Sequence, residues 1–183
     1  MNQRRESRSP INPIVVLTVV GLVLAAAVYW FVIRDDSNDN SSSGPKTFTA
    51  PGNSFSFKYP ATFAESGTSG GYVFIGGVGP HDYISVKRLQ NFPTSVARLA
   101  KEMPGTLKAV PGTTITNQGK VTHAGVTMVT IDGTLSLDGE TTPVKLYFFS
   151  ANGVTWQLGC AAATQPAVIN PACSAALDSF KAS

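Results

Sequence analysis

The chain has 183 residues, and its length and composition exclude several classes of protein. That length fits one ordinary domain with attachments rather than two full domains. Apolar residues make up 43% and charged residues only 14%, which excludes a chain dominated by a charged disordered tail. The net charge of +3 comes entirely from the four arginines before residue 35, less Glu6. Residues 35–183 are therefore neutral, and we expect no nucleic-acid partner.

An apolar segment near the N-terminus predicts a transmembrane helix. Residues 14–33 read IVVLTVVGLVLAAAVYWFVI, without a charge. A helix of this length spans roughly 30 Å, the thickness of the hydrocarbon core of a bilayer. Three arginines precede the segment, whereas Arg34 is followed at once by two aspartates. The positive-inside rule then places the N-terminal tail, residues 1–13, in the cytoplasm and the rest of the chain outside the cell membrane.

A cleavable signal peptide is the alternative to this anchor, because the alanines at 25–27 resemble a cleavage site. The apolar run continues to Ile33, however, where a mature N-terminus should turn polar. Both alternatives deliver the domain to the same side of the membrane. A lipid anchor is excluded, since no cysteine precedes Cys160.

Residues 34–46 are small and polar and predict a flexible linker. A random coil of about twelve such residues reaches only ~20 Å on average. The domain that follows, residues 47–183, should therefore stay close to the outer membrane surface.

The first half of this domain is predicted to hold three strands and a helix. Aromatic residues alternate with polar ones up to Pro60, which is typical of a half-buried strand. Apolar residues at helical spacing follow later and stop at Pro104 and Gly105. The expected strands are 55–59, 72–76 and 83–89, with a glycine-rich turn at 76–80 between the last two, and the expected helix is 94–103.

The second half predicts a four-stranded meander and a closing helix. Asp-Gly and Asn-Gly pairs favour tight turns, because their residues tolerate positive φ, and short turns make neighbouring strands antiparallel. The expected strands are 113–122, 126–137, 141–150 and 154–162, and the helix is 172–181. The fold class is therefore α+β, an antiparallel sheet of about six to seven strands flanked by two helices. Trp156 should lie in its core.

The two cysteines, Cys160 and Cys173, are predicted to form a disulfide. Cysteines outside the cytoplasm are usually paired. This bridge would join the end of the last strand to the start of the last helix. Two buried free thiols remain the alternative in a reducing compartment.

Candidates for catalysis are few. Residues 67–71 match the G-x-S-x-G pattern of hydrolases around Ser69, but a strand follows where that pattern requires a helix. The two histidines, His81 and His123, fall at predicted turns. We find no metal-ligand spacing and no phosphate or dinucleotide motif, so we expect no enzyme activity, cofactor or metal. A hydrolase or transferase of the cell envelope that uses Ser69 or His81 is the weaker alternative.

The stretch 66–82 is unusually rich in glycine. Two plain turns around a short strand would explain it. A binding loop is the functional alternative, and its residues would be Gly70, Gly71, Gly77, Gly79 and His81.

The order of elements and four short segments resemble the PsbP-like domain. The segments are FSFKYP at 55–60, FFS at 148–150, GVTW at 153–156 and SFK at 179–181. This superfamily includes secreted bacterial members similar to the LpqN-type lipoproteins. The resemblance implies an antiparallel sheet flanked by helices and a binding or assembly role without catalysis. It implies no particular site residue, and the chain departs from the lipoprotein members by lacking a lipidated cysteine.

Together these observations favour a single-pass, membrane-anchored domain outside the cytoplasm that binds a protein or component of the envelope near the membrane. A carrier of a small apolar or glycan ligand, held between sheet and helix, is the second hypothesis. The sequence names neither partner nor ligand.

Overall fold

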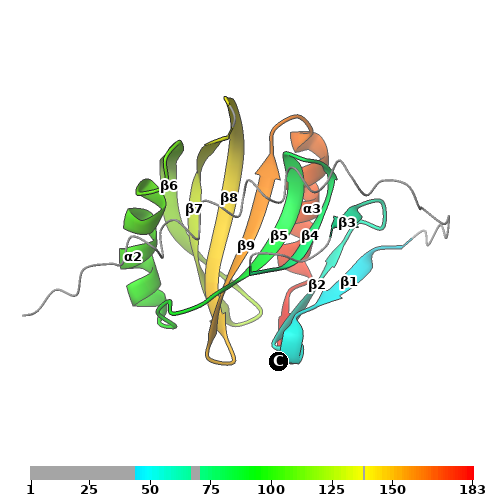
Figure 1. Ribbon diagram of the computed structural model, residues 1–183. Helices are drawn as coiled ribbons and strands as arrows, with labels where there is room; N and C mark the ends of the chain where they lie inside the picture. The colour runs from blue at the N-terminus through cyan, green and yellow to red at the C-terminus, as the bar shows by residue number, and fades with distance from the viewer. Residues whose placement is uncertain (1–43, 67–70, 138) are drawn as a thin grey trace, which may run out of the picture.

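The computed structural model of the chain describes residues 44–66, 71–137 and 139–183, which form an α+β domain with two antiparallel sheets and two α-helices (Figure 1). The predicted membrane segment, residues 14–33, and most of the predicted linker lie outside these residues. Among the residues described, neither helix is long and apolar enough to cross a membrane. Lys46, assigned by sequence to the end of the linker, begins the first strand.

The larger sheet has seven strands in the order β3-β4-β5-β9-β8-β7-β6, and every neighbouring pair is antiparallel. The meander predicted for the second half of the domain is confirmed, as are the two strands before the first helix. The strands are β3 Ala64–Ser66, β4 Tyr72–Gly79, β5 Asp82–Leu89, β6 Thr113–His123, β7 Val126–Leu137, β8 Glu140–Ala151 and β9 Val154–Ala162.

The smaller sheet was not predicted as a separate unit. It consists of β1 Lys46–Thr49, β2 Phe55–Tyr59 and β10 Lys181–Ala182, in the order β1-β2-β10, with a short 3-10 helix, Pro51–Asn53, between β1 and β2. The predicted strand 55–59 is confirmed as β2. The strands β1, β3 and β10 were missed because each has four residues or fewer, too short to show an alternating pattern.

The first helix, α2 Val96–Lys108, runs five residues past its predicted end. Pro104 lies inside the helix, although it cannot donate a backbone hydrogen bond and normally ends or kinks a helix. Continuing the helix buries Leu107 beside Leu99 and Met103, one turn apart on the same face. Burial of that side chain offsets the lost hydrogen bond, so the predicted end at 103 was wrong.

The last helix, α3 Pro166–Asp178, begins six residues before its predicted start and ends three residues before its predicted end. Pro166 is the first helical residue, where its missing N–H costs nothing. Pro171 lies within the helix rather than in a loop, and Cys173 lies near its middle rather than at its start. The final predicted residue, Lys181, belongs to β10 instead.

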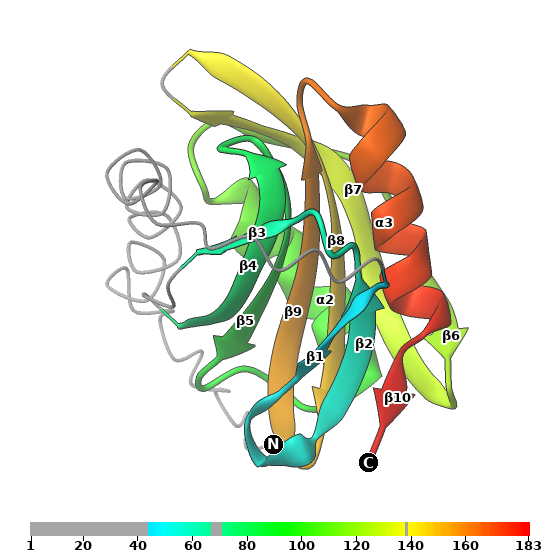
Figure 2. The ribbon, with the colours of Figure 1, turned by 90° about the vertical axis from the view of Figure 1, so that its right-hand side faces the viewer.

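The two faces of the seven-stranded sheet carry separate cores. Figure 2 shows α3 and the small sheet in front of the large sheet and α2 behind it. On one face, α3 and the small sheet pack over a large aromatic cluster that includes Trp156, which is 2% exposed. The predicted burial of Trp156 is therefore confirmed. On the other face, α2 packs against β6, β7 and β8 over a smaller aliphatic cluster. The candidate site lies on this second face, beside α2.

Candidate functional site

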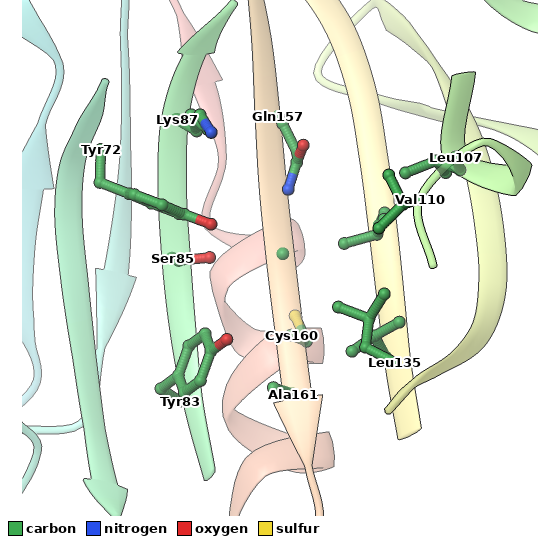
Figure 3. A pocket seen from close by; sticks show the side chains of 13 residues that line it. Tyr72, Tyr83, Ser85, Lys87, Leu107, Val110, Leu135, Gln157, Cys160 and Ala161 are labelled. Carbon is green, nitrogen blue, oxygen red and sulfur yellow. The ribbon is translucent and has the colours of Figure 1, made fainter. Parts of the chain in front are cut away.

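A cavity of about 60 Å³ lies on the α2 side of the sheet, between the end of α2 and strands β4, β5, β7, β8 and β9 (Figure 3). We call it the Lys87 cavity. Polar side chains of β4, β5 and β9 form one wall, and aliphatic side chains of α2, the turn after it, β7 and β8 form the other. The polar residues are Tyr72, Tyr83, Ser85, Lys87 and Gln157, and the aliphatic ones are Leu107, Val110, Leu135, Val144 and Leu146.

Strand alternation explains how β5 supplies three of the polar groups. Successive side chains of a strand point to opposite faces of the sheet. Ile84 and Val86 are fully buried in the aromatic core on the far face. Tyr83, Ser85 and Lys87 therefore share the α2 face, and Gln157 lies opposite Lys87 in the β5–β9 register.

Lys87 is the unusual member of this wall, since its side chain is only 6% exposed. A buried ammonium group is normally paired with a carboxylate. Within the part of the chain that the structure describes, Lys87 makes no ion pair, and its contact is with the ring of Tyr72, whose centroid lies 4.9 Å from Nζ. Burial lowers the pKa of the Lys87 amine below its ordinary value.

The two tyrosines beside Lys87 are held in their neutral form. Burial raises the pKa of Tyr72, and the neighbouring Tyr83 raises it further. Burial likewise raises the pKa of Tyr83. Both hydroxyls therefore keep their protons at any physiological pH and can donate hydrogen bonds into the cavity, toward which Figure 3 shows them pointing.

Gly159 forms the floor of the cavity. A Cβ at this position would lie 3.0 Å from Ser85 Oγ and 3.3 Å from Leu146 Cδ2. Any side chain here would fill the space between the two walls. The absence of a side chain at 159 is thus what leaves room for a ligand.

The cavity grades from a buried floor to an open rim. Ser85, Lys87 and Gly159 are buried, whereas Val110, Leu135, Val144 and Gln157 are half-buried. A group that enters would meet the half-buried residues of the rim before the buried ones. The site is thus suited to a ligand with one polar end and an apolar remainder.

The residues of the predicted binding loop do not form one loop. Gly71 precedes β4, while Gly77 and Gly79 lie within it and His81 lies in the turn that follows. In the described part of this stretch, one strand is followed by a turn at 80–81 rather than 76–80, and the turn expected before the strand lies largely outside the described residues. Gly77 has a packing role, since a Cβ there would lie 2.7 Å from the Tyr83 Cα. A binding role for these residues stays a prediction.

The remaining candidates do not converge on a reactive centre. Ser69 and Gly70 lie outside the described residues, so the hydrolase alternative stays untested. His81 Nε2 lies 3.2 Å from the Glu140 carboxylate at the surface. His123 ends β6, beside the tight turn to β7. Within residues 44–66, 71–137 and 139–183, no cluster of three or more His, Cys, Asp or Glu side chains could hold a metal.

Asp82, next to His81, has a structural role that the sequence did not reveal. Its carboxylate accepts hydrogen bonds from the backbone N–H groups of Thr164, at 2.9 Å, and Gln165, at 2.8 Å, where α3 begins. Burial alone would raise its pKa, but these bonds and one from the Thr164 hydroxyl outweigh it and lower the pKa. Asp82 therefore anchors, from a distant strand, the two residues that lead into α3.

The predicted disulfide between Cys160 and Cys173 is confirmed, with the two Cα atoms 6.2 Å apart. It ties the end of β9 to the middle of α3. A second, wider hollow of about 440 Å³ lies beside it, between β8 and the first half of α3. Its wall includes exposed Lys145, Asn170 and Ser174, so it is a surface groove rather than an enclosed site.

Sequence reasoning missed the Lys87 cavity. The alternation of Tyr83, Ser85 and Lys87 indicated that three polar side chains share one face of a strand. Such a face is usually exposed to water, so the pattern did not predict a cavity. The contribution of α2 and of Gly159 depends on contacts between segments far apart in the chain. Those contacts leave no local pattern to read.

Comparison with known proteins gives no sequence relative. No protein-family model matches the chain. No curated protein matches it either.

Solved structures do resemble it. The cyanobacterial PsbP protein (CyanoP) of Synechocystis sp. PCC 6803 has a TM-score of 0.62 and 11% identity, and the match covers 82% of this chain and 99% of that one. LpqN of Mycobacterium tuberculosis has a TM-score of 0.50 and 16% identity over 81% of this chain and 93% of its own. The Ran-binding protein Mog1p of Saccharomyces cerevisiae has a TM-score of 0.50 and 10% identity over 76% of this chain and 95% of its own. The domain therefore has a PsbP-like fold, as the sequence resemblance implied.

Proposed function

We propose that this protein is a non-catalytic binding or accessory domain of the cell envelope. It is held outside the cytoplasm by a membrane helix at residues 14–33 and a short linker, and it binds an envelope or membrane protein close to the bilayer. The observation on which the proposal most depends is the PsbP-like fold.

The solved neighbours support a binding role. LpqN is described as involved in cell envelope biogenesis, and Mog1p as a Ran-binding protein. Neither description names an enzyme reaction. Transferred to this chain, they favour recognition of another macromolecule over chemistry.

The disulfide supports the location. Disulfides persist in oxidising compartments outside the cytoplasm and are rare within it. The positive-inside pattern around residues 14–33 points to the same side of the membrane. The two signals are independent, since one comes from the N-terminus and the other from the folded domain.

Reporter fusions and crosslinking test this proposal in its native membrane. A reporter that is active only after export, fused after Ser183, should be active, and a reporter active only in the cytoplasm should be silent. Crosslinking in intact cells should capture one envelope protein reproducibly. The reverse reporter pattern would overturn the topology, and crosslinking that yields no specific partner would overturn the accessory role.

The Lys87 cavity favours a second candidate, a carrier of a small ligand held between sheet and helix. Its polar wall, apolar wall and buried floor are the features expected of a small-molecule site. Native mass spectrometry of protein purified from its own host should then show a bound molecule. Protein that is consistently free of ligand would argue against a carrier and would leave the accessory role unaffected.

A further inference from the structure

We propose that the Lys87 cavity is a binding site for the carboxylate end of a small aliphatic acid, with Lys87 as the charge that recognises it. The inference gives the carrier function a ligand class and rests on that second candidate, not on the accessory role. It depends on three features of the cavity: its charge, its hydrogen-bond donors and its shape.

The charge comes first. Lys87 is 6% exposed and has no ion-pair partner within the described residues. A buried ammonium without a counter-charge destabilises a fold, and such groups are found chiefly where a ligand or reaction needs them. An anion in the cavity would supply the missing counter-charge.

The donors define the kind of anion. Each polar side chain of the lining can donate a hydrogen bond: the Lys87 ammonium, the Tyr72, Tyr83 and Ser85 hydroxyls, and the Gln157 amide. Within the described parts of the chain, no Asp or Glu side chain lines the cavity. A group with two acceptor oxygens side by side, such as a carboxylate, matches this set of donors.

A single lysine and a mostly aliphatic second wall favour a monoanion with an apolar body. A phosphate dianion would need more than one cation, and among the residues that the structure describes Lys87 is the one cationic side chain of the lining. A cavity of about 60 Å³ has room for a small polar group such as a carboxylate, since about 10–15 Å³ of this kind of volume already holds one water molecule. The aliphatic remainder would then leave along Val110, Leu135 and Val144 at the half-buried rim.

Isothermal titration calorimetry on the full chain in phosphatidylcholine nanodiscs tests the site, with empty nanodiscs as the blank. Three probes of equal length isolate the charge: hexanoate, hexanol and hexylammonium. Hexanoate should bind saturably and at least tenfold more tightly than hexanol, and hexylammonium should not bind. N-acetyl-leucine, which resembles the carboxyl end of a polypeptide, shows whether a chain terminus is preferred to a free acid.

Variants locate the binding. Lys87→Met keeps the aliphatic stem and removes the charge, so it should weaken hexanoate binding at least tenfold. Gly159→Ala places a methyl group on the floor of the cavity and should weaken binding of every probe that binds. Arg88→Met is the matched control, because it makes the same change in net charge at the next residue, which is exposed. It should leave the affinity unchanged.

Several results would overturn the site. Equal affinity for hexanoate and hexanol would remove the role of charge, and tighter binding of inorganic phosphate than of hexanoate would exclude a carboxylate. Loss of binding in Arg88→Met as large as in Lys87→Met would mean that net charge, not the cavity, attracts the acid. None of these results would alter the reporter or crosslinking outcomes, so the two proposals can fail separately.

Discussion

The two faces of the seven-stranded sheet differ in what their side chains are suited to do. The face under α3 and the small sheet is packed with aromatic rings, among them Phe149 and Trp156, whose centroids lie 5.2 and 5.1 Å from that of Phe55. The face beside α2 has aliphatic residues at one side and the Lys87 cavity at the other. The first arrangement maximises buried apolar area, while the second leaves a charged group without an ion-pair partner among the described residues. Stability should therefore depend on the α3 face and binding on the α2 face.

The strongest test of this division is the substitution Trp156→Ala. Trp156 is 2% exposed and packs edge-on against Phe55, with centroids 5.1 Å apart. Its removal should lower the free energy of unfolding by about 3–5 kcal/mol, as for other buried aromatic residues. Urea denaturation followed by circular dichroism measures the change.

Two controls sharpen that result. Trp156→Phe should lower the free energy of unfolding much less, because an aromatic ring is kept. The indole Nε1 that is lost has no hydrogen-bond partner among the described residues. Gln157 follows Trp156 in the chain but lies on the α2 face. Gln157→Ala should lower the free energy of unfolding by less than about 1 kcal/mol. A larger loss at Gln157 than at Trp156 would contradict the assignment of stability to the α3 face.

Removing the Cys160–Cys173 disulfide should have the next largest effect. A closed loop near this size stabilises a fold by roughly 3 kcal/mol in the chain-entropy estimate. Reduction should lower the melting temperature by several degrees and should loosen α3 first, because the bridge ties that helix to β9. Hydrogen exchange with and without a reductant measures both.

The control is the intact mass of protein isolated without reductant and treated with an alkylating agent. Two alkylated cysteines in protein from its native compartment would show that the bridge does not form there. Loosening of α2 rather than α3 after reduction would contradict the proposed order of unfolding.

Asp82 should account for a smaller, pH-dependent part of the stability of the α3 face. Asp82→Asn weakens the hydrogen bonds to the backbone just before α3 and should lower the free energy of unfolding by about 1–2 kcal/mol at neutral pH. The folded pKa of Asp82 is lowered, so its stabilisation is fully present above the ordinary pKa of about 3.9. It is lost as the pH falls below that value and through the folded pKa.

Unfolding curves at several pH values test the sign of this effect. The difference between wild type and Asp82→Asn should be constant from pH 5 to pH 7 and should shrink below about pH 4. A difference that grows as the pH falls would contradict a carboxylate stabilised in its charged form.

The sequence predicted the parts of this molecule that are set by local patterns. The predicted strands 126–137 and 154–162 have the same bounds as the observed β7 and β9. Side-chain alternation and Gly-containing turns mark such long antiparallel strands. The burial of Trp156 followed from the same patterns, while the disulfide followed from the location expected for two cysteines outside the cytoplasm.

What the sequence could not predict depends on distant contacts. Pro104 and Pro171 normally mark helix ends, yet both lie inside helices that tertiary packing sustains. The strand β10 exists only because it pairs with β2, more than a hundred residues earlier. The Lys87 cavity needs the end of α2 to lie against a strand face that, by alternation alone, would be exposed to water.

The smallest expected effect is the most informative one, since it should have the opposite sign. Lys87→Met replaces a buried ammonium by an apolar side chain of similar length, so it should raise the free energy of unfolding of ligand-free protein by about 0.5–2 kcal/mol.

The folded pKa of Lys87 is lowered, so the unfolded wild-type chain binds more protons between the folded and the ordinary pKa. Wild-type stability should therefore rise with pH in that interval, below the ordinary pKa of about 10.4, while the variant gains nothing there. Thermal unfolding of both proteins from pH 7 to pH 10, with Arg88→Met as the exposed control, measures this. A Lys87→Met protein less stable than wild type would mean that the ammonium has a stabilising partner, and an anion would then not be needed to explain it.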